Sequence, residues 1–153
     1  MKIKIISIGN NPSKSIQDIL LKYTSRFDDH FKIELLEIKP EKKFKSVEQK
    51  KLQEAQKILK FIDNDFTVSL DENGSPWSSK DLSENLSKWM QSFPKVTFII
   101  GGADGLDKKI IEDSNLVWSL SKLTLPHNLV KIILVEQLYR ASTMLNNHPY
   151  HRE

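Results

Sequence analysis

The stretch that most constrains the fold spans residues 96–140. It opens with V-T-F-I-I-G-G-A-D-G-L, where a short apolar strand pattern runs into a glycine-rich loop. A second short strand pattern, W-S-L-S-K-L-T-L-P-H, ends in a loop with a proline, and L-V-K-I-I-L-V-E-Q-L-Y-R then follows with the pattern of a long amphipathic helix. Ligands of open α/β sheets bind beyond the carboxyl ends of strands. These two loops therefore predict a crevice at one edge of a sheet.

The rest of the chain alternates strand and helix patterns. Strands are predicted over residues 2–8, 33–38 and 66–70, the last ended by the turn signal D-E-N-G-S-P. Helices are predicted after a cap at Ser13 or Ser15, after a capping box at Ser46 and Gln49, and over residues 80–90 and 108–113. The second helix is expected to turn one apolar set inward: Val47, Leu52, Ala55, Leu59 and Ile62. This order predicts a single α/β domain over residues 1–153, with a mostly parallel sheet and helices on both faces.

The composition excludes several chemistries. The 153 residues include no cysteine, which rules out disulfides, thiolate zinc sites and cysteine nucleophiles. The four histidines are not spaced as metal ligands, so no metal is expected. No apolar run is long enough for a membrane helix, and the first residues lack the features of a signal peptide, so a cytoplasmic protein is expected. A formal charge of +3 favours a polyanionic partner only weakly.

The two loops do not match the common phosphate-binding motifs. Residues 101–105 fit neither G-x-G-x-x-G nor the P-loop, and the chain has no G-x-S-x-G nucleophile elbow. Glycines without a phosphate motif favour either a tight strand-to-helix turn or a close approach of the backbone to a nucleoside. Residues 118–126 leave a similar pair of alternatives, a strand with a proline turn or a loop whose backbone binds an adenine edge.

Several motifs together resemble one known family. They are I-I-G-G-A-D-G-L, S-L-S-K-L-T-L-P-H, V-E-Q-L-Y-R-A and the ending N-H-P-Y-H-R-E, supported by M-K-I-K-I-I-S-I-G and V-S-L-D. In order and spacing they closely resemble the RlmH family of small SPOUT-superfamily methyltransferases. The resemblance implies transfer of a methyl group from S-adenosyl-L-methionine to N3 of a pseudouridine, of the pseudouridine-1915 type, in 23S rRNA of the assembled ribosome. It also implies a C-terminal trefoil knot and a homodimer.

The resemblance also implies a set of site residues. The implied cofactor contacts are Leu70, Gly101, Gly102, Leu120, Ser121, Lys122, Leu123, Thr124 and Leu125. The tail of one subunit is expected to approach the cofactor of the other. An alternative is a ribosome-associated RNA-binding protein that keeps the fold without catalysis, which cofactor binding would distinguish.

The C-terminal tail carries the candidate catalytic groups. N3 of pseudouridine is an imide nitrogen, so a base or a cation that favours its deprotonated form should help transfer. His151, Tyr150 and Arg140 are the candidates for this role, and Arg152 and His148 are candidates for substrate binding. The alternatives are a frayed terminus and, for Arg140, an ordinary helix-surface ion pair with Glu136.

Other singled-out residues have simpler interpretations. Trp118 is expected to lie in the core. Trp77 is expected to pack within its loop, and His127 is expected to hold a loop in place. Residues 39–45 form a basic loop (K-P-E-K-K-F-K) that could contact RNA phosphates or could simply be solvated.

Overall fold

Residues 1–151 are described by a computed structural model. Five parallel strands form one sheet in the order β2-β1-β4-β3-β5. The strands are β1 (Lys2–Ile8), β2 (Lys32–Ile38), β3 (Phe66–Pro76), β4 (Lys95–Ile100) and β5 (Leu116–Ser119). The helices are α1 (Lys14–Thr24), α2 (Val47–Leu59), α3 (Ser79–Ser92), α4 (Lys108–Asp113) and α5 (His127–Leu145), followed by the 3-10 turn η1 (Pro149–His151). The parallel α/β sheet predicted from the sequence is confirmed.

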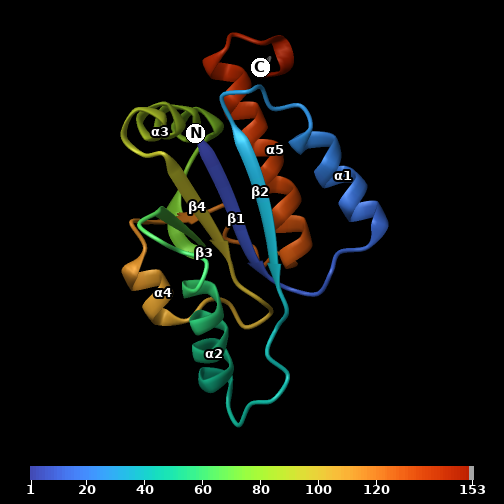
Figure 1. Cartoon of the computed structure of the whole chain (residues 1–153), viewed down its shortest axis with the longest axis vertical. Helices are drawn as coiled ribbons and strands as arrows, with labels where there is room; N and C mark the ends of the chain where they lie inside the picture. The colour runs from blue at the N-terminus through green and yellow to red at the C-terminus, as the bar shows by residue number, and fades with distance from the viewer. Residues whose placement is uncertain (152–153) are drawn as a thin grey trace.

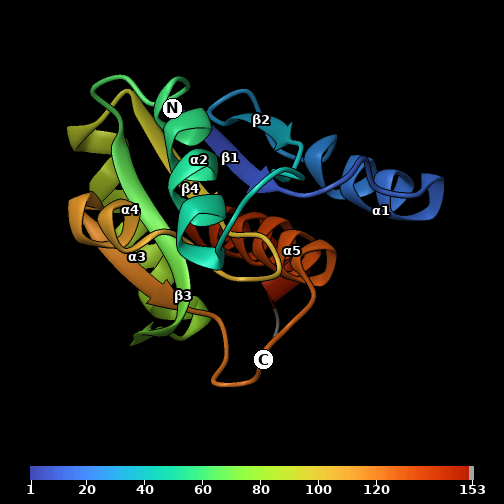
Figure 2. The same cartoon turned by 90° about the horizontal axis from the view of Figure 1, so that it is seen from below.

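Helices cover both faces of the sheet, as Figures 1 and 2 show. Side chains alternate across each strand, so Ile3 and Ile5 of β1 face one layer while Ile6 and Ile8 face the other. The first layer contains α1, α3 and α5, and the second contains α2 and α4. No helix within residues 1–151 combines the length and apolarity needed to span a membrane.

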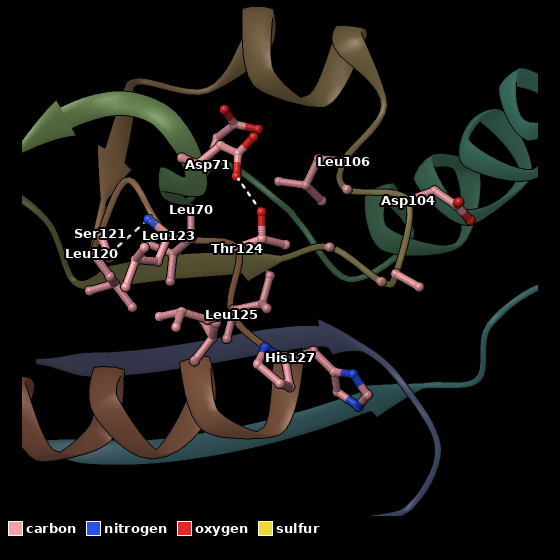
Figure 3. Close-up of a pocket in the computed structure, with 18 of the residues that line it drawn as sticks. Leu70, Asp71, Asp104, Leu106, Leu120, Ser121, Leu123, Thr124, Leu125 and His127 are labelled. Carbon is pink, nitrogen blue, oxygen red and sulfur yellow. Dashed lines mark hydrogen bonds between the residues drawn. The ribbon is translucent and has the colours of Figure 1, made fainter.

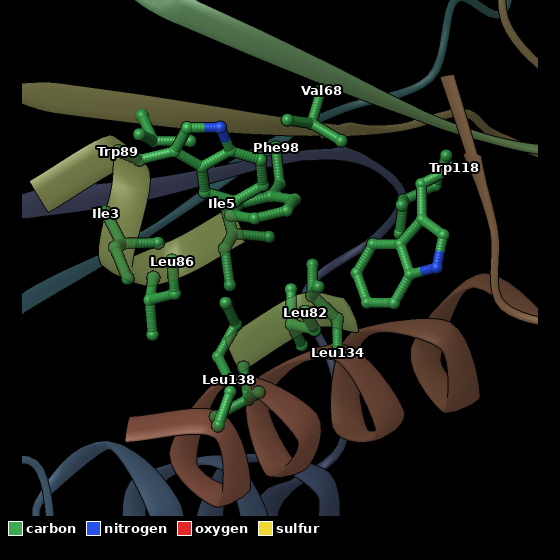
Figure 4. Close-up of a cluster of buried hydrophobic side chains, with 14 of the residues drawn as sticks. Ile3, Ile5, Val68, Leu82, Leu86, Trp89, Phe98, Trp118, Leu134 and Leu138 are labelled. Carbon is green, nitrogen blue, oxygen red and sulfur yellow. The ribbon is translucent and has the colours of Figure 1, made fainter. Parts of the chain in front are cut away.

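The larger core lies between the sheet and α3 with α5 (Figure 4). Trp118 is 3% exposed there, and the ring of Trp77 stacks on it with centroids 4.9 Å apart. The ring of Trp118 also makes an edge contact with Phe98, and Phe98 makes a second edge contact with Trp89. Both tryptophan predictions are confirmed, since Trp118 is core and Trp77 packs against it.

The prediction that β3 ends at Leu70 is wrong. The strand continues to Pro76 after a shift in register, so that Leu70 and Ser75 both pair with Trp118. The turn signal is used inside the strand, where Asp71 accepts a hydrogen bond from the backbone N–H of Asn73. Gly74 allows this, because a Cβ there would lie 2.8 Å from the backbone of β5. The chain therefore bulges instead of turning back.

The predicted inward face of α2 is also wrong in part. Val47, Leu52 and Leu59 are more than two-fifths exposed, and the buried apolar residues are Ala55 and Ile58. The helix lies at one end of its layer and packs against the sheet with only a narrow apolar stripe, so its other apolar side chains face outward.

The capping box at the start of α2 is half formed. The Ser46 hydroxyl accepts a hydrogen bond from the Gln49 backbone, but the Gln49 side chain accepts one from Lys45 instead of Ser46. A complete capping box joins Ser78 and Asp81 at α3, where the sequence analysis did not predict one.

Candidate functional site

Three strand ends meet at one level of the sheet. In β3, Leu70 pairs with Ile100 of β4 on one side and with Trp118 of β5 on the other. The segments after these three positions therefore open onto the same edge. They enclose a crevice of about 770 Å³ (Figure 3), within the size range of cofactor and small-molecule sites.

The glycine loop forms one wall of the crevice. The backbone N–H of Gly105 donates to the carbonyl of Gly102 at 3.0 Å, and Gly105 has a φ of +78°, which favours glycine. A Cβ at Gly101 would lie 2.6 Å from the carbonyl carbon of Gly105. Asp104 points away to the Lys50 ammonium, 2.6 Å from it, and so ties the loop to α2. The tight-turn alternative is confirmed, and the loop also lines a cavity. The approach of its backbone to a nucleoside stays a prediction.

The segment from Leu120 to Pro126 forms the opposite wall. The Ser121 hydroxyl accepts a hydrogen bond from the Leu123 backbone, and the Ser119 hydroxyl donates to the Ser121 carbonyl. Across the crevice, the Thr124 hydroxyl donates to the Glu72 carboxylate at 3.1 Å (Figure 3). The segment is thus held by its own serines and by the extension of β3.

The structure brings most of the predicted cofactor residues together. The residues that line the crevice include Leu70, Gly101, Gly102, Leu120, Ser121, Leu123, Thr124 and Leu125. Lys122 is exposed and is not among them. The lining also includes Asp71, Glu72 and Lys51, which the sequence analysis did not assign to the site. Two consecutive acids after a buried strand were the available signal for the first two.

The chemistry of the lining favours an uncharged or cationic ligand. Leucines from β3 and from the 120–125 segment supply apolar walls, and Asp71, Glu72 and Asp104 supply carboxylates. Lys51 is the one lysine or arginine in the lining among the described residues. A polyphosphate would meet few cations here, in agreement with the missing phosphate motifs.

A buried ionic group lies behind the crevice at the start of α5. Lys131, 2% exposed, forms an ion pair with Glu37 of β2, and the Ser7 hydroxyl donates to the same carboxylate oxygen at 3.0 Å. The other oxygen of Glu37 and Nε2 of His127 are buried without a hydrogen-bond partner. Each lies within 2.5 Å of where a Cβ on Gly9 would stand, so Gly9 is required for this approach. His127 thus packs where the crevice segment enters α5, as its loop-holding prediction expects.

The C-terminal tail folds onto the far end of α5. The Tyr150 hydroxyl donates to Glu136 at 3.0 Å, and its ring lies 5.1 Å from the Arg140 guanidinium. Arg140 also pairs with Glu136 at 2.7 Å, so the ion pair considered from the sequence is formed. Burial, followed by hydrogen bonds with Tyr23 and Glu136, raises the pKa of Tyr150. The phenol therefore stays protonated at neutral pH.

The two candidate histidines of the tail are placed differently. His148 accepts a hydrogen bond at Nδ1 from the Tyr150 backbone, whereas Nδ1 of His151 is buried without a partner. Arg152 lies outside the described residues.

The tail and the crevice are not brought together within one chain. The crevice borders His127 at the start of α5, and Arg140 lies 13 residues later, about 20 Å along a helix. Figure 1 shows the C-terminal end of α5 at the end of the molecule opposite α2. The predicted catalytic and cofactor residues thus occupy two separate regions of the chain.

Comparisons with known proteins agree with this fold. Residues 1–151 match the family model described as "Predicted SPOUT methyltransferase". A probable methylase family protein from Haemophilus influenzae Rd KW20 superposes with a TM-score of 0.59 at 13% identity, over 99% of this chain and 70% of that one. A tRNA (m1G37) methyltransferase from Aquifex aeolicus gives a TM-score of 0.53 at 11% identity, over 92% and 70%. The chain belongs to the SPOUT methyltransferase class.

Sequence relatives narrow the class to one family. The chain is 41% identical to "Ribosomal RNA large subunit methyltransferase H" of Methylobacillus flagellatus and 40% identical to the protein of the same name from Chromobacterium violaceum, over the full length of each pair. Within the SPOUT class, it is a member of this RlmH family, as the motifs predicted.

Proposed function

We propose that this protein transfers a methyl group from S-adenosyl-L-methionine to N3 of a pseudouridine in 23S rRNA of the assembled ribosome. The observation that carries the proposal is the convergence of Leu70, the glycine loop and the 120–125 segment on one crevice. These are the positions that the RlmH resemblance assigns to the cofactor, and full-length relatives are named as methyltransferases of large-subunit rRNA.

The crevice has the chemistry that this cofactor needs. Bound S-adenosyl-L-methionine supplies a methyl group made electrophilic by a sulfonium. Leu70, Leu120 and Leu125 would enclose the adenosyl group, and backbone groups of the tight loops would recognise its polar edge. Asp71 and Glu72 would accept hydrogen bonds from ribose hydroxyls and favour a cationic ligand.

The tail supplies groups for the acceptor nucleotide. Since the raised pKa of Tyr150 keeps its hydroxyl protonated, Tyr150 is suited to donate a hydrogen bond and not to remove the N3 proton. This leaves His151 as the candidate base, because the Nδ1 of its imidazole is buried without a hydrogen-bond partner. Arg140 would stabilise the negative charge of the deprotonated pseudouridine. His148 and Arg152 would contact the substrate RNA.

A homodimer would unite the two regions. Because about 20 Å of helix separates them within one chain, the tail of one subunit is proposed to complete the crevice of its partner. The trefoil knot in the C-terminal half stays a prediction of the family resemblance.

Methyl transfer to ribosomes is the direct test. Purified protein is mixed with radiolabelled S-adenosyl-L-methionine and bacterial ribosomes that lack this modification, and the labelled nucleotide is mapped by mass spectrometry. Label at N3 of one 23S pseudouridine is the expected result. Cofactor binding without label would indicate another RNA substrate, and absence of both would favour the non-catalytic binding protein.

A further inference from the structure

The positive charge of the protein is concentrated in one segment. Residues 39–60 contain eight lysines and three glutamates, a formal charge of +5. Because the whole chain carries +3, the other 131 residues together carry −2. The small net charge is therefore the sum of one strongly basic segment and a mildly acidic remainder. This charge distribution is expected of a protein that contacts a polyanion locally.

This segment lies beside the crevice. It comprises the loop after β2 and helix α2, which extend together from the lower end of the molecule in Figure 1. Lys51 of α2 lines the crevice, and Lys50 forms the 2.6 Å ion pair with Asp104 of the glycine loop. A nucleic acid held on this segment would therefore pass the mouth of the crevice.

Three lysines of the loop are exposed, whereas two lysines of α2 are held in ion pairs. Lys57 is paired with Glu41 at 2.9 Å, and Lys50 with Asp104. In contrast, Lys42, Lys43 and Lys45 are exposed. Their backbone N–H groups donate to the side chains of Glu41 and Gln49, so the loop is shaped without use of the lysine ammonium groups. Three exposed cations within four consecutive residues can each neutralise a backbone phosphate.

An exposed aromatic ring lies among these lysines. Phe44 is 43% exposed, with the Lys50 ammonium 5.3 Å from its ring centroid. An aromatic platform within a cationic groove is the combination that holds single-stranded nucleic acid, because phosphates pair with the cations while a base stacks on the ring.

We propose that the basic loop, defined as Lys42, Lys43, Phe44 and Lys45, binds single-stranded RNA that flanks the nucleotide in the crevice. The lysines contact backbone phosphates, and Phe44 stacks with one unpaired base. The inference rests on the proposed function and adds to it the surface by which the RNA is positioned.

Salt-dependent binding to ribosomes tests the lysines. The variant Lys42→Gln/Lys43→Gln/Lys45→Gln is compared with wild type by sedimentation binding to bacterial 70S ribosomes over a series of salt concentrations. Each lost phosphate contact should reduce the slope of log affinity against log salt by about 0.7 to 0.9, so the triple variant should lose about 2 to 3 units of slope. Cofactor affinity should stay within about threefold of wild type, which reports that the crevice is folded.

A matched variant controls for net charge. Lys14→Gln/Lys22→Gln/Lys88→Gln removes three exposed lysines from α1 and α3 and should keep the wild-type slope. An equal loss in both variants, or an unchanged slope in the loop variant while wild type methylates ribosomes, overturns the inference and leaves the proposed function standing. Wild type that neither binds nor methylates ribosomes overturns both.

Substitution of Phe44 separates stacking from charge. Phe44→Leu keeps an apolar side chain but removes the ring, and should weaken ribosome binding about tenfold with the salt slope unchanged, whereas Phe44→Trp should restore it. Equal binding by Phe44→Leu and wild type would remove the stacking role. If Leu52→Ser on the outer face of α2 instead abolishes binding and the slope is near zero, the surface contacts a protein and the RNA proposal fails.

Discussion

Gly101 and Gly102 are adjacent in the chain, but a methyl group added at each meets a different neighbour. At Gly101 the nearest atoms are backbone, 2.6 Å and 2.8 Å away in Gly105 and Leu106. At Gly102 the nearest atom is Cγ2 of Ile8, a side-chain methyl group 3.0 Å away. Backbone cannot yield without opening the loop, whereas a side chain can move by a few tenths of an ångström.

This difference predicts that alanine substitutions at the two glycines lower the cofactor affinity to different extents. Gly101→Ala should weaken S-adenosyl-L-methionine binding at least about tenfold, because the tight turn must open, and Gly102→Ala should change it by less than about threefold. Isothermal titration calorimetry with the cofactor measures both. Equal affinities in the two variants would show that the glycine loop does not form the ligand wall.

Tyr150 offers a pH-dependent prediction. Its folded pKa is raised above the ordinary value of 10.0 by burial and by hydrogen bonds with Tyr23 and Glu136. Docking of the phenol therefore contributes stability that is complete below about pH 10 and is lost as the pH rises through the folded pKa. Phenolate absorbance of wild type minus that of Tyr150→Phe should show a transition above pH 10. A midpoint at or below 10 would mean that the tail is not docked on α5.

The contact between β2 and α5 includes one buried charge pair. Lys131 is almost fully buried, and its partner Glu37 also accepts the Ser7 hydroxyl, so three elements share one carboxylate. Removal of one partner leaves an uncompensated charge, which costs more than replacement of both.

A pair of substitutions measures this contact. Lys131→Met should lower the free energy of unfolding by about 3 kcal/mol, and Glu37→Leu/Lys131→Met should recover most of that loss because no buried charge is left. Urea denaturation gives both values. A double variant that is less stable than Lys131→Met would show that the side chains contribute through packing and not through charge.

Periodicity predicted the elements well and their irregularities poorly. The order of strands and helices followed from alternating apolar patterns, and the bounds of α4 agree with the prediction at both ends. The extension of β3 did not follow, because D-E-N-G-S-P signals a turn locally and only pairing with β5 keeps the chain in the sheet. The exposed leucines of α2 were missed since an apolar pattern does not show how wide a stripe the sheet covers.

For the whole molecule, the sequence predicted which residues form the site, and the structure shows how these residues are placed relative to one another. The predicted cofactor residues came from a family resemblance, and the fold gathers all of them except Lys122 around one crevice. Asp71 ends the V-S-L-D motif and Glu72 follows it, but neither residue was assigned to the lining, because acids after a strand do not by themselves indicate a cavity. The distance between crevice and tail could not be read from the sequence, because it depends on the length of α5 and on where the tail packs.

The placement of the crevice and the tail at opposite ends of α5 has a genetic consequence. If each working site takes its crevice from one subunit and its tail from the other, two proteins that each have little activity at a limiting cofactor concentration should rescue each other. Gly101→Ala keeps the tail, and deletion of residues 150–153 keeps the crevice with cofactor affinity within a few-fold of wild type. Unfolded and refolded together in equal amounts, they should regain about a quarter of wild-type methyl transfer, because half of the dimers are mixed and each mixed dimer has one intact site. No recovery would mean that each chain completes its own site, and the tail would then have to leave α5 to reach it.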